Sequence, residues 1–334
     1  MPTRRRTLLL ATPPLLLAAP LVAARAQEGS GGPWPSRPVR IVVPYPPGGS
    51  TDVLARAVAE RLQAAIPGSA FVVENRPGGA AVVGTQAVAQ AAPDGYTLAL
   101  GNNQTHAANA AMLRDLPYRP VEDFVPVGRL AEVHHALVVP ATSPARTLAE
   151  LVARGKGGGG GKLTYASSGV GSASHVIAES LVRREGMEAT HLPYRGGAQA
   201  TTDTVSGVVD FFVSTWPQVV ALVQEGRLRC LGIGAPRRLP GLPEVPTLAE
   251  AGAPYMAVDA WFGLFAPART PAPVVARLSA ALPGILAEPE MVDRLARLGF
   301  QAAPMPAAEF GEFQRDEVAR WRELVALTGI RLEN

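Results

Sequence analysis

Residues 40–62 read RIVVPYPPGGSTDVLARAVAERL, and they join a short apolar run to a helical pattern through a turn of proline and glycine. The run over residues 41–43 is β-branched and ends at a proline, which is typical of a buried strand. At four positions over residues 54–66 an apolar side chain recurs every four residues, which places these side chains on one helical face. The stretch therefore predicts a strand, a Gly-rich turn and an amphipathic helix in that order.

Similar units follow along the chain. Strands are predicted at residues 40–43, 71–74, 96–100, 136–139, 163–166, 210–213, 229–233 and 262–265. The C-terminal part carries two helical stripes, at residues 274–285 and at residues 310–325, the second ending near Gly329. Short strands that alternate with amphipathic helices predict an α/β fold with parallel or mostly parallel sheets.

The N-terminus has the pattern of an export signal. Three arginines at residues 4–6 precede a short apolar stretch at residues 8–22, and Ala-Arg-Ala at residues 24–26 fits a cleavage site before Gln27. The apolar stretch contains prolines and is too short to span a bilayer. We expect a cleavable signal peptide over residues 1–26 and export to the periplasm by the Sec or the twin-arginine route.

Charge and cysteine content exclude two classes of protein. The chain has 31 basic and 28 acidic residues, and four of the basic ones precede Gln27, so 31 less 4 leaves 27 against 28 afterwards. The mature chain is nearly neutral, which argues against nucleic-acid binding. Cys230 is the single cysteine, so no internal disulfide holds the fold, and its apolar neighbours predict a buried side chain.

Four Gly-rich turns carry the chemistry. They lie at residues 45–52, 76–79, 167–172 and 194–197, each after a predicted strand or at the start of a helix. Glycine lets the backbone approach a ligand closely, and a helix N-terminus offers unpaired N–H groups to an anion. The chain after Gln27 is long enough for two lobes, and two such turns from different lobes can hold one carboxylate between them. The alternative for each turn alone is an ordinary helix cap, and Asp52 fits that role.

Seven motifs occur in an order that resembles the Bug-type receptors of tripartite tricarboxylate transporters. They lie at residues 42–52, 74–79, 93–98, 163–172, 193–197, 243–247 and 261–264. The resemblance covers nearly the whole mature chain. It implies a two-lobed periplasmic-binding-protein (type II-like) fold, in which each lobe is a mixed, mostly parallel sheet flanked by helices. Proline-rich breaks near residues 140–144 and 254–261 then divide the chain into lobe 1, residues 27–140 plus 262–334, and lobe 2, residues 141–261.

The resemblance also implies a function and a set of ligand contacts. A small carboxylate is captured between the lobes and delivered by a monomeric receptor to the permease subunits of a tripartite membrane transporter. The expected ligand-binding residues are Tyr45, Pro47, Gly48, Gly49, Ser50, Thr51, Asp52, Asn102, Asn103, Thr105, Ser167, Gly169, Gly171, Ser172, His175, Tyr194 and Ser214. Ser214 stands where relatives often carry an acidic or amide residue, so the resemblance leaves the identity of the carboxylate open.

Two other functions are alternatives. A secreted hydrolase needs a nucleophile and a base, but the chain has no Gly-x-Ser-x-Gly and no His-Glu-x-x-His, and His175 follows Ser167 only within a helix start. His134 and His135 are adjacent and would point to opposite faces of a strand, so they do not form a metal pair. We therefore expect no catalytic residue, cofactor or metal. A ligand-sensing partner of a membrane signalling protein is compatible with the same fold.

Overall fold

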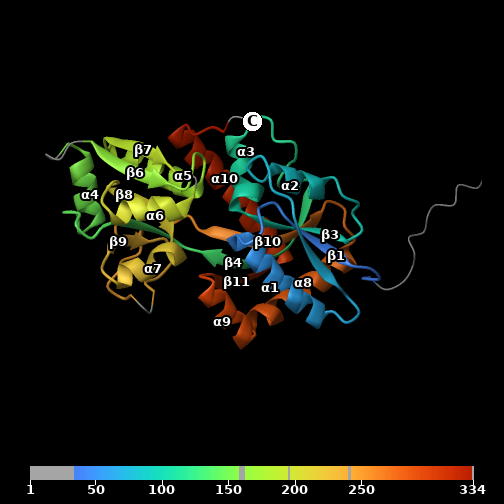
Figure 1. Cartoon of the computed structure of the whole chain (residues 1–334). Helices are drawn as coiled ribbons and strands as arrows, with labels where there is room; N and C mark the ends of the chain where they lie inside the picture. The colour runs from blue at the N-terminus through green and yellow to red at the C-terminus, as the bar shows by residue number, and fades with distance from the viewer. Residues whose placement is uncertain (1–33, 158–161, 195, 240–241, 333–334) are drawn as a thin grey trace, which may run out of the picture. The chain divides into compact units, whose positions relative to one another are not determined.

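The computed structural model describes residues 34–157, 162–194, 196–239 and 242–332. The chain from Trp34 onward forms one compact unit with two β-sheets and flanking helices (Figure 1). The predicted signal peptide, residues 1–26, lies outside the described residues. In the described part, no helix has both the length and the apolarity needed to cross a membrane.

The first sheet has six strands in the order β11-β4-β10-β3-β1-β2. Their bounds are β1 (Val39–Val43), β2 (Phe71–Asn75), β3 (Thr97–Asn102), β4 (Phe124–Val133), β10 (Ala260–Pro267) and β11 (Gln301–Pro306). Its helical segments are α1 (Ser50–Ala65), α2 (Val82–Ala89), η1 (Gln104–Ala108), α3 (Asn109–Met112), α8 (Ala272–Ala287), α9 (Pro289–Arg297) and α10 (Ala307–Thr328). Strand β1 pairs in parallel with β2 and β3, whereas the pairs of β10 with β3 and β4, and of β11 with β4, are antiparallel.

The second sheet has five strands in the order β7-β6-β8-β5-β9. Their bounds are β5 (His135–Pro140), β6 (Leu163–Ser167), β7 (Ala189–Pro193), β8 (Phe211–Thr215) and β9 (Leu228–Ile233). The accompanying helices are α4 (Leu148–Gly155), α5 (Ala173–Glu185), α6 (Gly197–Val205), α7 (Trp216–Gln224) and the short η2 (Pro254–Met256). Pairs β6–β7 and β6–β8 are parallel, and pairs β5–β8 and β5–β9 are antiparallel.

These sheets confirm the predicted α/β class with mixed sheets, but the prediction that they are mostly parallel is wrong, because four strand pairs are parallel and five are antiparallel. Parallel pairing is restricted to the strand–helix–strand units, and the long strands that carry the chain between the sheets pair antiparallel. Strands β4 and β11 were not predicted from the sequence. Both pair antiparallel, so the prediction lacked these antiparallel pairs.

The chain crosses between the sheets twice. It leaves β4 at Val133 and enters β5 at His135, and it returns from β9 to β10 through residues 234–259. The predicted lobe boundary at residue 140 placed residues 135–140 in lobe 1, but β5 pairs with β8 and β9 of the second sheet. Helix α10 contacts both β4 and α5 and so adds a third connection.

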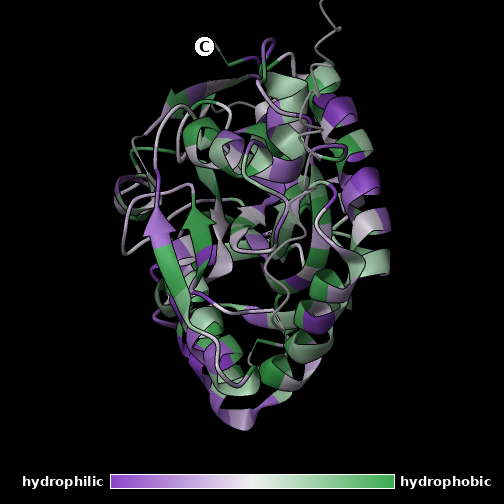
Figure 2. Cartoon of the chain, turned by 90° about the vertical axis from the view of Figure 1, so that its right-hand side faces the viewer, coloured by the Kyte–Doolittle hydropathy of each residue, from purple (hydrophilic) through white to green (hydrophobic). Residues whose placement is uncertain are grey.

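The core follows the strands. Apolar residues dominate the strands, and the helices carry alternating apolar and polar bands, as Figure 2 shows. One buried apolar cluster lies under α1 and α8, and another extends from Trp261 and Phe265 of the first sheet to Leu137 and Tyr165 of the second. Such a continuous apolar interior fixes the strand ends on which the site depends.

Cys230 is buried, as the sequence predicted. Burial raises the pKa of its thiol to about 12. The side chain therefore acts as a small hydrophobe rather than a reactive group.

Candidate functional site

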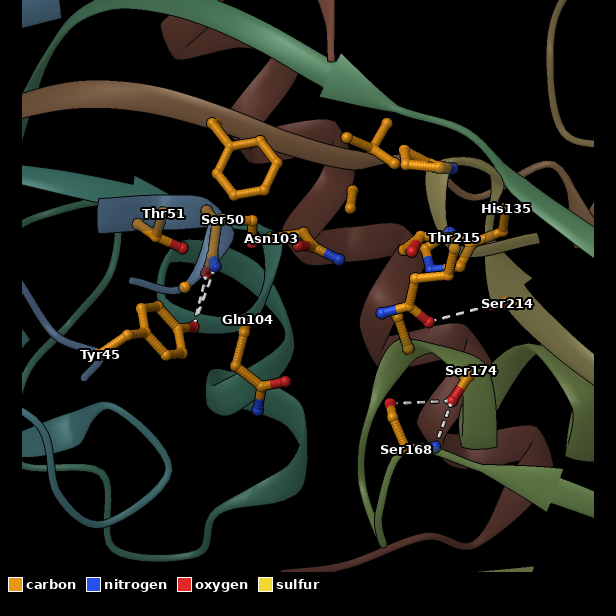
Figure 3. Close-up of a pocket in the computed structure, with 18 of the residues that line it drawn as sticks. Tyr45, Ser50, Thr51, Asn103, Gln104, His135, Ser168, Ser174, Ser214 and Thr215 are labelled. Carbon is orange, nitrogen blue, oxygen red and sulfur yellow. Dashed lines mark hydrogen bonds between the residues drawn. The ribbon is translucent and has the colours of Figure 1, made fainter. Parts of the chain in front are cut away.

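A cleft of about 790 Å³ lies where the strand ends of the two sheets meet. In Figure 3 Tyr45, Ser50 and Asn103 from the first sheet face Ser168, Ser174 and Ser214 from the second. Its lining consists of Tyr45, Pro46, Pro47, Gly48, Gly49, Ser50, Thr51, Asn102, Asn103, Gln104, Val133, His135, Ser168, Ala173, Ser174, Phe212, Val213, Ser214, Thr215, Pro217, Gln218, Ala260, Phe262, Leu298 and Phe300. No lysine, arginine, aspartate or glutamate of the described residues belongs to this lining. The volume suits a small organic ligand.

The Gly-rich turn before α1 forms one wall of the cleft. Gly48 adopts φ +81°, a conformation that favours glycine, and α1 begins directly afterwards at Ser50. Among the described residues, none accepts a hydrogen bond from the backbone N–H of Gly49, Ser50 or Thr51. Three unpaired N–H groups at the positive end of a 16-residue helix favour an anion.

Asp52, predicted as a ligand contact, lies outside the cleft lining and shapes the turn instead. Its side chain is only 3% exposed, and it accepts hydrogen bonds from Gly48 N at 2.9 Å, Arg56 Nε at 3.0 Å and Asn75 Nδ2 at 2.9 Å. Burial opposes ionisation, but the bonds from Arg56, Gly48 and Asn75 outweigh it and hold the pKa of Asp52 below its ordinary value. The N–H of Gly48 is therefore engaged within the protein, and its three successors are left for a ligand.

The strand end of β3 supplies a polar floor. The Tyr45 hydroxyl lies 2.9 Å from Asn102 Nδ2 and 3.1 Å from Asn102 Oδ1. Burial raises the pKa of Tyr45, so the phenol stays neutral. Thr105, also predicted as a contact, is fully buried behind this pair, where its hydroxyl bonds Asn102 and His106. Asn103 points into the cleft in Figure 3, with no hydrogen-bond partner for its amide among the described residues.

The second Gly-rich turn presents different residues from those predicted. Ser168, Ala173 and Ser174 line the cleft, whereas the predicted residues Ser167, Gly169, Gly171, Ser172 and His175 do not. The hydroxyls of Ser168 and Ser174 lie 3.1 Å apart. The Ser172 hydroxyl caps α5 by accepting from His175 N at 3.3 Å and donates to Gly169 O at 2.7 Å. This turn therefore uses most of its hydroxyls to hold its own shape.

Two further predicted contacts, His175 and Tyr194, lie outside the cleft lining, and Tyr194 is half-buried. The rings of His175 and His191 stack with centroids 3.7 Å apart. The pKa of His175 is lowered to about 4, first by burial and then by His191. Ser167 bonds His191 Nε2 at 2.7 Å, but it is fully buried outside the cleft lining, so this pair has no access to a substrate there. Tyr194 donates its hydroxyl hydrogen to Asp203 at 2.7 Å.

Several lining residues were not predicted. The polar ones are Gln104, His135, Ser168, Ser174, Thr215 and Gln218, and the apolar ones include Val133, Phe262, Leu298 and Phe300. Phe262 and Phe300 make an edge-to-face pair with centroids 5.2 Å apart, although 38 positions separate them in the sequence. The predicted Ser214 does line the cleft and donates to Gln218 Oε1 at 3.1 Å.

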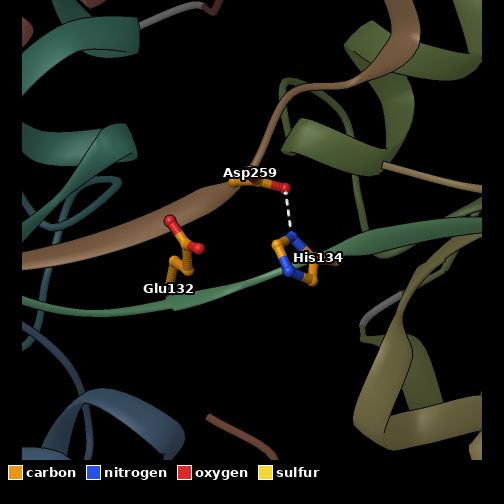
Figure 4. A group of neighbouring side chains, drawn as sticks. All are labelled: Glu132, His134 and Asp259. Carbon is orange, nitrogen blue, oxygen red and sulfur yellow. Dashed lines mark hydrogen bonds and ion pairs between the residues drawn. The ribbon is translucent and has the colours of Figure 1, made fainter. Parts of the chain in front are cut away.

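An ion-pair cluster joins the two crossovers. His134 Nδ1 lies 2.9 Å from Asp259 Oδ1, His134 Nε2 lies 3.0 Å from Gln301 Oε1, and Glu132 is close by (Figure 4). Both ring nitrogens of His134 already have acceptor partners, so the geometry describes a hydrogen-bonded imidazolium rather than a metal ligand. The neighbouring His135 bonds Val258 O instead, so the two rings take different partners.

Raising the pH should weaken this cluster. Burial lowers the pKa of His134, but Asp259 above all, with Glu132 and Gln301, outweighs burial and raises it. A raised pKa means that the stabilisation is present below the unfolded value near 6.5 and is lost as the pH rises through the higher folded value. His134→Gln should therefore cost more unfolding free energy at about pH 6 than at about pH 8.5. Urea unfolding of the wild-type protein and the His134→Gln variant at both pH values measures this cost. A cost that is independent of pH would contradict a protonated His134.

Three comparisons place these features among known proteins. The family described as "Tripartite tricarboxylate transporter family receptor" matches residues 54–330. Protein BugT of Bordetella pertussis is 34% identical, over 98% of this chain and 99% of that protein. The R. palustris protein Rpa4515, solved with adipate, is 32% identical with a TM-score of 0.76, covering 89% of this chain and 99% of that one. MatC from Rhodopseudomonas palustris, solved with bound malate, is 34% identical with a TM-score of 0.72, covering 87% and 100%.

Proposed function

Because the chain belongs to the tripartite tricarboxylate transporter receptor family, we propose that it captures a small carboxylate in the cleft and delivers it to the membrane components of a tripartite transporter. It is a solute-binding receptor and not an enzyme. We further propose that it acts as a monomer in the periplasm, after removal of residues 1–26.

The single observation that carries the proposal is the free N-terminus of α1. The N–H groups of Gly49, Ser50 and Thr51 open on the cleft without acceptors among the described residues. Neutral donors aligned with a helix dipole bind a carboxylate without a basic side chain. The similar proteins MatC and Rpa4515 were solved with malate and adipate, which are both carboxylates.

Capture requires both walls of the cleft. The carboxylate is bound at the turn before α1, and the body of the ligand then contacts Ser168 and Ser174 from the second sheet and Phe262 from a crossover strand. Since the walls are joined through the crossovers at residues 133–135 and directly before β10 at residues 257–259, these segments act as the hinge for closure around the ligand.

A thermal-shift screen of the mature protein from Gln27 onward tests the ligand class. A ligand that binds only the folded protein stabilises it by about 2.7 kcal/mol at a hundred times its dissociation constant. We expect one or a few small carboxylates to raise the melting temperature, and sugars and cationic amino acids to leave it unchanged. A shift with sugars or cations alone would refute carboxylate capture. Uptake of the active acid by cells with and without the receptor then tests delivery.

A further inference from the structure

His135 is a cleft residue whose role the proposed function does not assign. It begins β5 immediately after the first crossover and lines the cleft, although the residue is only 3% exposed. Its labelled position in Figure 3 is on the wall of Ser214 and Thr215, across the cleft from Ser50.

The hydrogen bond at one ring nitrogen determines the tautomer. His135 Nδ1 lies 2.7 Å from the carbonyl oxygen of Val258. A carbonyl oxygen only accepts, so Nδ1 must carry the proton. Burial lowers the pKa of the ring, against smaller opposing effects of Val258 and Asp259, and a neutral ring has no second proton. Nε2 therefore presents a lone pair.

That lone pair has no hydrogen-bond donor in the part of the chain that the structure describes. Among the described residues, none donates a hydrogen bond to Nε2, and this atom is not among the fully buried unpaired atoms. Since the residue itself is nearly buried and lines the cleft, the remaining access of Nε2 is from the cleft. A ligand that fills the cleft removes water from this acceptor, and an acceptor left without a donor is costly, so the position favours a ligand that supplies a donor.

We propose that His135 Nε2 accepts a hydrogen bond from the ligand, so that the receptor selects acids that carry a hydroxyl or N–H donor apart from their carboxylate. The inference rests on the proposed function, because it takes the carboxylate to be bound at the turn before α1. The two sides of the cleft therefore suit different groups of one ligand. The backbone donors at Gly49 and Ser50 favour an anion, whereas the acceptor at His135 repels an anion and favours a donor.

The apolar residues between these two sides are consistent with this ligand class. Val133 and Phe262 line the cleft from the crossover strands, and Phe300 packs on Phe262. They suit a hydrocarbon or aromatic body between the carboxylate and the donor. Hydroxy acids and N–H-bearing acids with such a body match the turn before α1 with their carboxylate, the apolar residues with their body and His135 with their donor.

Calorimetric titration with matched acids tests the selection. Each hydroxy acid, such as 3-hydroxybutyrate or 4-hydroxybenzoate, is compared with its deoxy analogue and its O-methyl ether, which keeps the oxygen but cannot donate. We expect the best hydroxy acid to bind at least about tenfold more tightly than either analogue, because the analogues leave Nε2 unpaired. If the acids bind but the three affinities agree, the inference fails and the proposed function stands; if no acid binds, the proposed function itself fails.

Two variants tie the selection to this side chain. His135→Phe should bind the hydroxy acid and the ether equally, whereas His135→Gln, whose amide can donate to Val258 and accept from the ligand, should keep part of the preference. Thermal unfolding checks that each variant is folded. Should the phenylalanine variant not fold, ¹⁵N resonances of the histidine ring in the wild-type protein still decide the matter. We expect an unprotonated Nε2 at neutral pH whose resonance moves with the hydroxy acid and not with the ether; a protonated Nε2, or equal shifts with both, would overturn the proposal.

Discussion

Gly48→Leu should lower carboxylate affinity at least about 100-fold, equivalent to about 2.7 kcal/mol of binding free energy. Gly48 lines the cleft, and a Cβ built on it meets no atom within 4 Å, so the leucine side chain enters open space beside the free N–H groups. The positive φ of +81° adds a backbone cost of about 1–2 kcal/mol to folding. Calorimetric titration with the acid found in the screen measures the affinity.

Gly68→Leu is the matched control for strain. Gly68 has φ +77°, its Cβ also meets nothing within 4 Å, and it does not line the cleft. Both variants should lose similar unfolding free energy, but only Gly48→Leu should lose binding. A folded Gly48→Leu protein with unchanged affinity would show that the turn before α1 is not the carboxylate site.

Asp52→Ala should destabilise the protein by about 2–3 kcal/mol and reduce carboxylate affinity at least about tenfold. The substitution removes one acceptor from Gly48 N, Arg56 and Asn75 together, so the turn loses the contacts that hold it open to the ligand. Asp52→Asn keeps an oxygen for Gly48 but loses the ion pair with Arg56, and its effects should be intermediate. Urea unfolding and calorimetric titration give the two quantities.

Asp94→Ala provides the comparison for an aspartate that is not part of the turn before α1. Its ion pair with Arg37 is exposed, and it also accepts a hydrogen bond from Tyr96 N at 3.0 Å, so its removal should cost about 1–2 kcal/mol and leave the affinity unchanged. Equal losses of affinity in the Asp52 and Asp94 variants would mean that Asp52 does not position the turn.

The sequence revealed those strands whose apolar character is continuous. All eight predicted strands occur, because each is a short apolar run bounded by breakers. The three strands that were not predicted lack a continuous apolar run or contain residues that disfavour a strand. Strand β4 contains Pro126 and Gly128 and has irregular register with β10, whereas β11 contains Pro304 and lies at a sheet edge, where proline is tolerated. Strand β7 is an edge strand in which no residue is fully buried, so it lacks a continuous apolar run.

The candidate site was only half visible in the sequence. The turn before α1 could be predicted because strand, turn and helix are consecutive, so residues 45–51 reach the cleft together. In the second turn the motif was recognised, but its backbone course turns Ser168 and Ser174 toward the cleft and Ser167 and Ser172 toward the protein. In an irregular turn the side chains of successive residues follow no fixed periodicity, so the sequence does not tell which of them point toward the cleft.

The other lining residues come together only in the folded protein and could not be predicted from local sequence patterns. His135 begins β5 just after the first crossover, Phe300 directly precedes β11, and no local pattern marks either as a ligand contact. The same crossover explains the displaced lobe boundary, since the proline break near residue 140 lies at the end of β5 and not at its start.

A crystal structure of the receptor with its tightest-binding acid tests the central claim most directly. The account predicts carboxylate oxygens at about 2.7–3.2 Å from the backbone nitrogens of Gly49, Ser50 or Thr51, inside the cleft between the two sheets. A carboxylate bound elsewhere, for example on a basic side chain while these three N–H groups bind only water, would contradict it.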